Sequence, residues 1–220
     1  DALIVIYESW EAVRSHIADF DPRTHRVVIT AATSWPLFNW GPNRFHVENV
    51  AEALDAPGEW HLTRDGKLSY IPRPGEDMTT AEVIAPLAES FIQFAGKPEA
   101  GEVVENIVLA GLTFQHADQR QGQDDYRGVQ AAVSMPAVVM ADGARHVIIQ
   151  DCQITQVGGY GVWFRRGCRN CRLERTYIHD LGAGGVRIGE TQIRKNEAER
   201  TGHIVVDNNI IRSGGHTHPA

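Results

Sequence analysis

The stretch Ala137-Val-Val-Met-Ala-Asp-Gly-Ala-Arg-His-Val-Ile-Ile-Gln-Asp-Cys-Gln-Ile-Thr-Gln-Val-Gly-Gly-Tyr160 is matched, in pattern, by the stretch that follows it, from Gly161 to Gly184. When Ala137 is placed on Gly161 and the rest of the chain is moved by the same step, glycines fall on glycines and apolar residues on apolar residues. Met140 falls on Phe164, and Phe164 in turn falls on Ile188. The other matching pairs are Gly143 with Gly167, Gly158 with Gly182, Gly161 with Gly185, Ile149 with Leu173, Ile154 with Ile178 and Val162 with Val186. Self-similarity at a period of roughly 20–50 residues is typical of solenoids.

Two further repeats fit with changes of length. The triplets that align are Ile107-Val-Leu109, Val147-Ile-Ile149, Cys171-Arg-Leu173 and Ile204-Val-Val206, and the intervals between them are unequal. The short apolar pairs that follow them are Leu112 and Phe114, Cys152 and Ile154, Tyr177 and Ile178, and Ile210 and Ile211. The core positions therefore keep their register while the loops between them vary, and such insertions are where solenoids carry function.

Each repeat holds short apolar segments of about three to five residues that alternate with period 2, which indicates strands. Three such strands in each repeat predict one turn of a right-handed, single-stranded parallel β-helix of the pectin-lyase-like class. A leucine-rich repeat would need a Leu-x-x-Leu-x-Leu-x-x-Asn signature, which is missing, and a propeller unit would be longer and antiparallel. The predicted fold is all-β, with successive coils about 4.8 Å apart.

Residues 1–98 lack the repeat and are predicted to form an N-terminal β-hairpin-rich module. We expect one hairpin over 15–30 and a second over 59–71, in which Trp60 and Leu62 face Leu68 and Tyr70. A short helix is predicted at 47–54 and further strands at 83–85 and 91–94. The aromatic loop 35–40 is interpreted as packing against the coils. Residues 99–220 form the coils, and we expect the coils to continue beyond the C-terminal end of this sequence.

Composition narrows the class of partner. The net charge of −7 argues against nucleic acid, which requires a basic surface, and against an anionic membrane surface. An acidic polysaccharide stays open, because one local arginine cluster can hold a carboxylate or a sulfate. No apolar run approaches the roughly 20 residues of a membrane span.

Neither a metal nor a cofactor is expected. The three cysteines, Cys152, Cys168 and Cys171, are too few for a disulfide scaffold, and we interpret them as buried thiols. Cys168-Arg-Asn-Cys171 has metal-ligand or redox spacing, but no second Cys pair accompanies it. The pair His216-Thr-His218 lacks a clear third ligand.

The repeat register predicts which side chains share a surface. Because Val162 and Phe164 point inward, Trp163 points outward, and Arg187 should lie beside it in the next coil. An arginine over an indole is either a cradle for a sugar or anionic group, or a structural cation–π pair on the outer wall.

Five more polar residues are candidates along one edge. In register, Asp180 stands over Gln156, and His116 falls at the same turn of the first coil. The residues expected to gather there are His116, Asp118, Asp180 and His216, with His179 beside Asp180. Glu190 opens an insertion, 191–200, near the end of a different strand.

Glycoside hydrolysis commonly uses two carboxyl groups, roughly 5–5.5 Å apart in retaining enzymes and roughly 6.5–9.5 Å apart in inverting ones. Asp180 is the favoured catalytic carboxylate, with Asp118 or Glu190 as its partner. Asp180 can also be interpreted as a turn residue whose carboxylate binds backbone amides. Asp118 and Glu190 can also be interpreted as ordinary solvated carboxylates. The histidines are interpreted as hydrogen-bonding wall residues.

Several long motifs also carry a family resemblance. They are Asn43-Arg-Phe-His-Val-Glu-Asn49, Glu52-Ala-Leu-Asp-Ala-Pro-Gly-Glu-Trp60, Glu105-Asn-Ile-Val-Leu-Ala-Gly-Leu-Thr-Phe-Gln-His-Ala-Asp118, Gly158-Gly-Tyr-Gly-Val-Trp163 and His179-Asp-Leu-Gly-Ala-Gly-Gly-Val-Arg-Ile-Gly-Glu190. Together they resemble glycoside hydrolase family 141 and related right-handed β-helix proteins, from about Trp35 onward. The resemblance implies α-L-fucosidase or xylanase activity, and the family's usual length implies several more coils than this sequence holds.

The leading hypothesis is a secreted or periplasmic glycoside hydrolase that acts on plant or algal polysaccharide, with the location resting on analogy alone. Asp180, Asp118 and Glu190 would be catalytic, and the substrate-binding residues would be Arg187, Trp163, His116, His179 and His216. One alternative is a polysaccharide lyase on the same fold, in which Arg165, Arg166 or Arg187 acts as base. The other is a glycan-binding β-helix without catalysis, because fold alone does not settle function.

Overall fold

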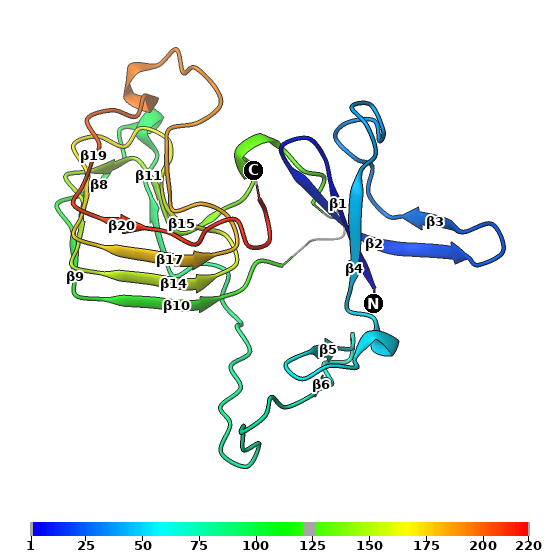
Figure 1. Cartoon of the computed structure of the whole chain (residues 1–220). Coiled ribbons are helices and arrows are strands. Elements are labelled where there is room, and N and C mark those ends of the chain that lie inside the picture. Colours follow the sequence, from blue (N-terminus) through cyan, green and yellow to red (C-terminus); the bar gives the residue numbers. More distant parts are fainter. Residues whose placement is uncertain (1, 121–125, 220) are drawn as a thin grey trace. The chain divides into compact units, whose positions relative to one another are not determined.

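The computed structural model describes residues 2–120 and 126–219 as an all-β chain with four single 3₁₀ turns. It divides into two compact units. The N-terminal unit comprises the residues up to Ile84 together with a return segment that ends at Gln130, and the coil unit comprises Ala85–Arg120 and Ala131–Pro219. Figure 1 shows both units. No helix among the described residues is long and apolar enough to cross a membrane.

The coil unit is built from parallel strands that stack coil upon coil (Figure 1). The first sheet holds β10 (Thr113–Ala117), β14 (Gln153–Val157), β17 (Tyr177–Leu181) and β20 (Ile210–Ile211). The second holds β7 (Ile92–Ala95), β11 (Ala137–Asp142), β15 (Tyr160–Phe164) and β18 (Val186–Ile188). The third holds β9 (Val108–Ala110), β13 (Ile148–Gln150), β16 (Arg172–Glu174) and β19 (Val205–Asp207), and β8 (Val104–Glu105) pairs with β12 (Ala144–Arg145).

The predicted register is confirmed in all three sheets. Ile154 pairs with Ile178, Ile149 with Leu173, and Val162 with Val186. The matches predicted for the strand that begins at Ala137 were wrong by a single position, since Ala137 lies beside Tyr160 and not beside Gly161.

Met140 lies beside Trp163, and Ala141 lies beside Phe164. The reason is one extra residue in the turn after β15, because Arg145 pairs with Arg169 and so restores the interval that joins Ile149 to Leu173. The extra residue leaves the rest of the coil in register.

The interior of the coils is a narrow apolar column. Ile149, Ile154, Phe164 and Leu173 have no exposed surface. The three cysteines are free and buried, as predicted. Burial raises the pKa of the Cys168 thiol to about 12, because a thiolate has no water to stabilise it there. These thiols act as small core residues.

One residue in each coil bends the chain at the same place in the first sheet. His116, Gln156, Asp180 and Ser213 all have φ between 51° and 62°. A positive φ is uncommon for residues other than glycine, and His, Asn and Asp adopt it more readily than most. The predicted stacking of Asp180 over Gln156, with His116 at the same turn, is therefore present in the backbone.

The N-terminal unit contains an antiparallel sheet in the order β3-β2-β1-β4, and a separate hairpin. The sheet strands are β1 (Leu3–Tyr7), β2 (Ala12–Asp21), β3 (Arg26–Ile29) and β4 (Arg44–Glu48), and the hairpin strands are β5 (Trp60–Leu62) and β6 (Leu68–Tyr70). Ile4, Ile6 and Val13 form its apolar cluster. Both predicted hairpins are confirmed, and Trp60 faces Tyr70 as expected.

Three predictions for the first half were wrong or displaced. The predicted helix at 47–54 is the end of β4 followed by one 3₁₀ turn, Ala51–Ala53, because Val47 pairs with Ile4 across the sheet. Residues 83–85 form no strand. The units divide between Ile84 and Ala85 and not near Lys97-Pro98, because β7 pairs with β11 of the coils.

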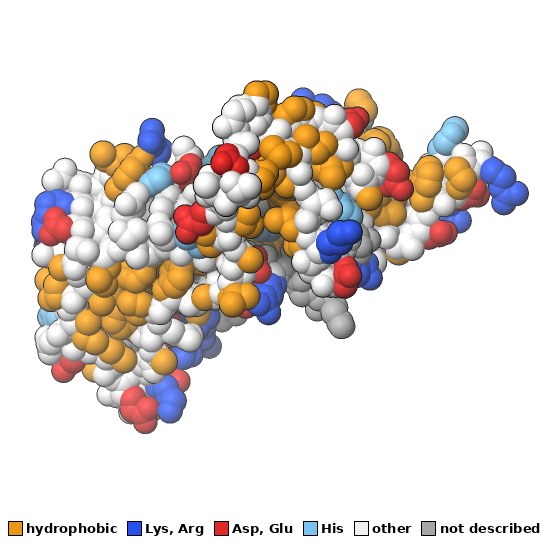
Figure 2. Space-filling model, turned by 90° about the horizontal axis from the view of Figure 1, so that it is seen from below, with side chains coloured by type: hydrophobic (Ala, Val, Ile, Leu, Met, Phe, Trp, Pro, Cys, Tyr) orange, Lys and Arg blue, Asp and Glu red, His pale blue; other side chains and the backbone are white. Residues whose placement is uncertain are grey.

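The remaining 3₁₀ turns are Pro98–Ala100, Gln130–Ala132 and Glu197–Glu199. The segment that carries the last of them leaves the coils after β18 and projects away from the stacked strands (Figure 1). Exposed hydrophobic side chains are spread over the surfaces of both units (Figure 2).

Candidate functional site

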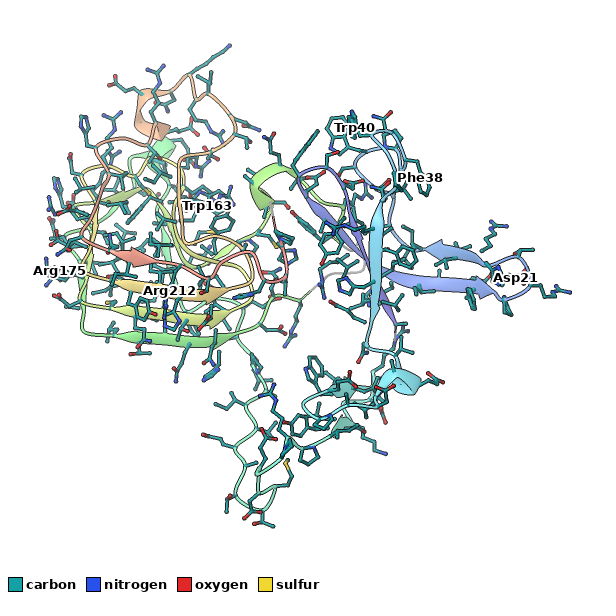
Figure 3. All side chains as sticks on the ribbon, viewed as in Figure 1. Asp21, Phe38, Trp40, Trp163, Arg175 and Arg212 are labelled. Atoms are coloured by element: carbon teal, nitrogen blue, oxygen red, sulfur yellow. The ribbon has the colours of Figure 1, made fainter. Side chains whose placement is uncertain are left out.

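Trp163 and Arg187 form the predicted stack on the outer face of the second sheet. The two residues pair in register between β15 and β18, and the guanidinium carbon of Arg187 lies 3.5 Å from the centre of the indole. The indole Nε1 donates to the carbonyl of Gly189, and Arg187 donates to the carbonyl of Met135, both at 2.8 Å. Trp163 is labelled in the coil unit in Figure 3, and its side chain is half-buried.

Arg187 has no carboxylate partner among the described residues. Burial lowers its pKa, because the charged guanidinium is partly removed from water. A partly desolvated cation that stacks on an indole and donates only to a carbonyl can still receive an anionic or hydroxyl oxygen of a ligand.

The insertion after β18 folds back over a pocket of about 280 Å³, which we call the insertion pocket. Its charged lining comprises Arg165, Glu190, Arg194, Glu199 and Arg200. The insertion that the sequence singled out at Glu190 therefore lines an open pocket beside the coils.

Two carboxylates share the insertion pocket, and one guanidinium bridges them. Arg194 donates from Nε and Nη2 to the two oxygens of Glu190, both at 2.8 Å, and its Nη1 lies 3.7 Å from Glu199. Arg166 also contacts Glu199, at 3.6 Å. The hydrogen bonds from Arg194 lower the pKa of Glu190, assisted by the charges of Arg166 and Arg165, so Glu190 is ionised at neutral pH.

Arg165 connects the insertion pocket with the Trp163 stack. Its guanidinium lies 5.4 Å from the indole centre, and Asp142 pairs with it through both carboxylate oxygens. Gly189, which accepts from Trp163, also lines the pocket. Of the residues predicted from the sequence, Trp163, Arg187 and Glu190 thus belong to one continuous surface.

Asp180 lies in a second cluster, on the first sheet. Its Oδ2 lies 2.7 Å from Nδ1 of His179, and its Oδ1 lies 3.9 Å from Nε2 of His216. The His179 ring stacks on Tyr177 at 4.0 Å, and its Nε2 is 3.0 Å from the Gln153 amide. Asp180 itself is about half exposed, so the predicted grouping of Asp180 with two histidines is present at an accessible edge.

The other two edge residues do not join this cluster. Asp118 accepts from the backbone of Gln119 and lies 3.5 Å from Arg120. His116 shares the turn position of Asp180 but belongs to a strand two places away in the sheet. None of the hydrogen bonds and ion pairs found among residues 2–120 and 126–219 links Asp180, Asp118 and Glu190 to one another.

Sequence reasoning missed Glu199. It lies in an insertion that no other coil repeats, so no register places it. The only available signal was the density of charges between Glu190 and Arg200. Within the described part of the chain, no group of three or more His, Cys, Asp or Glu side chains is arranged to hold a metal ion.

Comparisons with known proteins identify the fold. No protein-family profile matches the chain, and no curated protein sequence matches it. A solved structure titled "Glycoside hydrolase" superposes with a TM-score of 0.83 at 18% identity, over 99% of this chain and 45% of that one. The chain therefore has a glycoside hydrolase-like fold and spans less than half the length of that protein.

Proposed function

We propose that the chain is part of a glycoside hydrolase whose catalytic carboxylates are Glu190 and Glu199 of the insertion pocket. The observation that carries the proposal is the single guanidinium of Arg194, which contacts both carboxylates. Two groups bridged in this way are separated by a distance on the order of the roughly 5–9.5 Å that glycosidase carboxyl pairs span. The pocket adjoins an outward indole that can support a sugar ring.

The two carboxylates would divide the chemistry. Glu190, held ionised by Arg194, would act as nucleophile or base, or stabilise the positive charge that develops on the sugar. Glu199, which contacts Arg194 and Arg166, would be the second carboxyl group of the pair. Asp180, which the sequence favoured, is the rival carboxylate, with His179 and His216 as its proton-transfer partners.

Two cations without a carboxylate partner among the described residues favour an acidic substrate. Arg187 donates only to a carbonyl, and Arg200 donates only to the carbonyls of Arg194 and Lys195. Such guanidinium groups bind the carboxylate of a uronate or a sulfate ester well. We therefore infer a plant or algal polysaccharide that carries acidic groups, with fucosidase- or xylanase-like cleavage as in family 141.

Two broader inferences accompany this function. We infer that the coils wind as a right-handed parallel β-helix, because parallel crossovers are right-handed in about 98% of cases. A polymeric substrate does not cross membranes, so we infer a secreted or periplasmic location. Handedness is tested by an experimental structure and location by fractionation of the producing cell.

The test is glycan cleavage followed by two readouts, reducing ends and the ultraviolet absorbance of unsaturated uronates. The variants are Glu190→Gln, Glu199→Gln and Asp180→Asn. Glu197→Gln is the matched control, because its side chain is 79% exposed on the same 3₁₀ turn as Glu199. Each acid–base group contributes typically about 10²–10⁴-fold to the rate, so each pocket variant should lose about that much.

Reducing ends that persist in Glu190→Gln and Glu199→Gln but vanish in Asp180→Asn would move the site to the first sheet. Ultraviolet absorbance rising with the reducing ends would identify a lyase, the second candidate. That candidate has its own support, because Arg187 has no carboxylate partner among the described residues and could hold the carboxylate of a uronate. Glycan binding without either signal would identify a glycan-binding β-helix that has no catalytic activity.

A further inference from the structure

The N-terminal unit contains three tryptophans in mutual contact. Trp10, from the turn between β1 and β2, lies 5.7 Å from Trp35 and 5.5 Å from Trp40, measured between ring centres. Trp35 and Trp40 are themselves 5.7 Å apart. Between 42% and 57% of each residue is exposed. Exposed aromatic side chains that form one contiguous patch belong to a binding site more often than isolated exposed aromatic side chains do.

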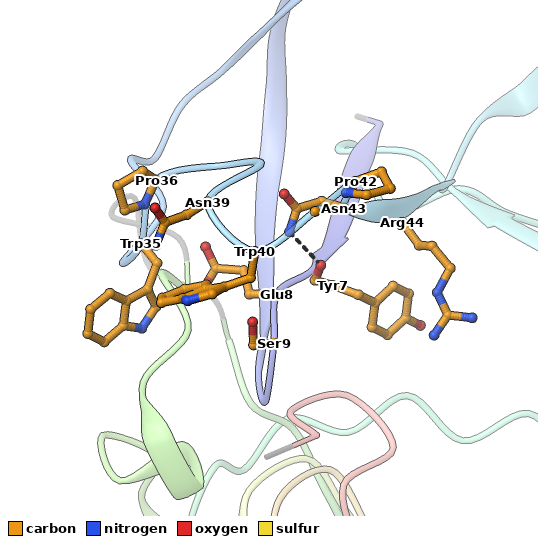
Figure 4. A pocket seen from close by; sticks show the side chains of 11 residues that line it. Tyr7, Glu8, Ser9, Trp35, Pro36, Asn39, Trp40, Pro42, Asn43 and Arg44 are labelled. Atoms are coloured by element: carbon orange, nitrogen blue, oxygen red, sulfur yellow. Dashed lines mark hydrogen bonds between the residues drawn. The ribbon is translucent and has the colours of Figure 1, made fainter.

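A pocket of about 180 Å³ opens beside two of these rings (Figure 4). This volume is below the roughly 300–1,000 Å³ of pockets that hold drug-sized ligands, and it suits a small polar group such as a single sugar unit. Besides Trp35 and Trp40, the polar lining includes Ser9, Asn39 and Arg44. Amide, hydroxyl and guanidinium groups around an aromatic platform are the groups that bind sugar hydroxyls.

The loop that carries Trp35 and Trp40 is held in a strained conformation. Phe38 has a φ of 63°, which is unfavourable for a bulky side chain. Asn43 holds the loop in place, because its Oδ1 accepts from the Phe38 amide at 2.7 Å and its Nδ2 donates to the Tyr7 carbonyl at 2.9 Å. Backbone strain of this kind persists where surrounding contacts impose it, and it clusters at binding sites.

The pocket lining also includes Glu8, which forms a pair of poorly solvated carboxyl groups with its neighbour Glu11. The four side-chain oxygens of Glu8 and Glu11 are inaccessible to water, and no well-aligned hydrogen bond reaches them from the described residues. Burial, and then the neighbouring Glu11 carboxyl, raise the pKa of Glu8 to about 7, while the Trp35 backbone lowers it. Once ionised, Glu8 repels an anion nearby.

We propose that the pocket beside Trp35 and Trp40 binds a neutral sugar unit of a glycan, stacked on an indole and hydrogen-bonded to Asn39 and Arg44. The choice of a glycan rests on the proposed function of the coil unit. The choice of a neutral unit rests on the lining, in which the one cationic group, Arg44, is accompanied by the carboxyl group of Glu8. The N-terminal unit would thus hold the polymer without cleaving it.

The test is calorimetric titration of the whole chain with neutral xylo- and gluco-oligosaccharides and with oligogalacturonides. Trp40→Ala should weaken neutral-sugar binding about tenfold, because an aromatic contact contributes on the order of that factor. Asn39→Ala should weaken it about fivefold, as expected for one lost hydrogen bond. Trp60→Ala is the matched control, since Trp60 is 61% exposed and lies in the β5–β6 hairpin, outside the pocket lining.

Three results would overturn the proposal: no neutral-sugar binding by the chain, equal binding by Trp40→Ala and the wild type, or an equal loss in Trp60→Ala. The Glu190→Gln variant separates the two sites. Cleavage lost in Glu190→Gln with neutral-sugar binding intact supports both sites. Neutral-sugar binding that is intact in Trp40→Ala and lost in Glu190→Gln removes the tryptophan pocket and leaves the proposed function standing.

Discussion

Replacing Glu8 by glutamine should remove a pH dependence of stability from the N-terminal unit. In the folded chain the pKa of Glu8 is raised from 4.5 to about 7. Folding therefore takes up a proton between these two values, and the free energy of unfolding falls as pH rises from about 4.5 to about 7. Above pH 7 this contribution is lost, and below pH 4.5 it is fully present.

The magnitude follows from the size of the pKa change. At 1.36 kcal/mol for each pKa unit, the change from 4.5 to about 7 sets a ceiling of about 3.4 kcal/mol. The carboxyl oxygens of Glu8 are covered but the residue as a whole is only half-buried, and solvent screening reduces the expected value to about 1–2 kcal/mol. Glutamine keeps the shape, cannot ionise and can donate to Glu11, so Glu8→Gln should be more stable than the wild type at pH 8 by that amount.

The assay is urea unfolding followed by tryptophan fluorescence at pH 5 and pH 8. Four of the five tryptophans belong to the N-terminal unit, so the signal reports mainly on that unit. Titratable groups that the wild type and the variant share contribute equally to both free energies of unfolding, so their contributions cancel in the difference. Glu82→Gln, at an exposed position, is the control and should show no pH-dependent difference. Parallel pH profiles for Glu8→Gln and the wild type would refute the reasoning.

Three further predictions concern the coils. Ile154→Ala should lower the free energy of unfolding by about 3–4 kcal/mol in urea titration, because the side chain is fully buried, and a loss below about 1 kcal/mol would contradict the proposed core. Gly182→Ala should destabilise strongly in thermal unfolding, because an added Cβ would lie 2.0 Å from the Gly158 carbonyl oxygen, whereas Gly202→Ala, with nothing within 4 Å, should not. Cys168 should resist alkylation at pH 8 until the chain is unfolded, because burial raises its pKa to about 12, and rapid modification of the native protein would place that thiol at the surface.

The coils could be predicted from the sequence because each one repeats the same physical requirement. A buried position such as Ile149 must meet another apolar residue one coil later, and Leu173 supplies it. Once that register is known, the contact between Trp163 and Arg187 follows without further information. The error of one position at Met140 arises because the turn after β15 has one extra residue. The apolar core positions on either side of that turn do not reveal the extra residue.

The pockets could not be predicted, because they are built from segments that do not repeat. Glu199 reaches Glu190 through the fold of a single insertion. In the N-terminal unit, β1 pairs with β4 although the two strands lie far apart in the sequence. No local sequence pattern predicts a pairing between such distant strands. The pattern at 47–54 favours a helix because nothing nearby in the sequence indicates that Val47 pairs with Ile4.

The two candidate carboxylates differ in how the fold supports them, and that difference decides how their variants must be interpreted. Asp180 is half exposed at a turn that every coil repeats, so Asp180→Asn should change stability by less than about 0.5 kcal/mol. Glu190 anchors Arg194, and Glu190→Gln leaves that guanidinium to Glu199 alone. Lost activity in Asp180→Asn would therefore be chemical in origin. Lost activity in Glu190→Gln counts as chemical only if the thermal midpoint is unchanged, because a loosened insertion would open the pocket and abolish cleavage without any catalytic role for Glu190.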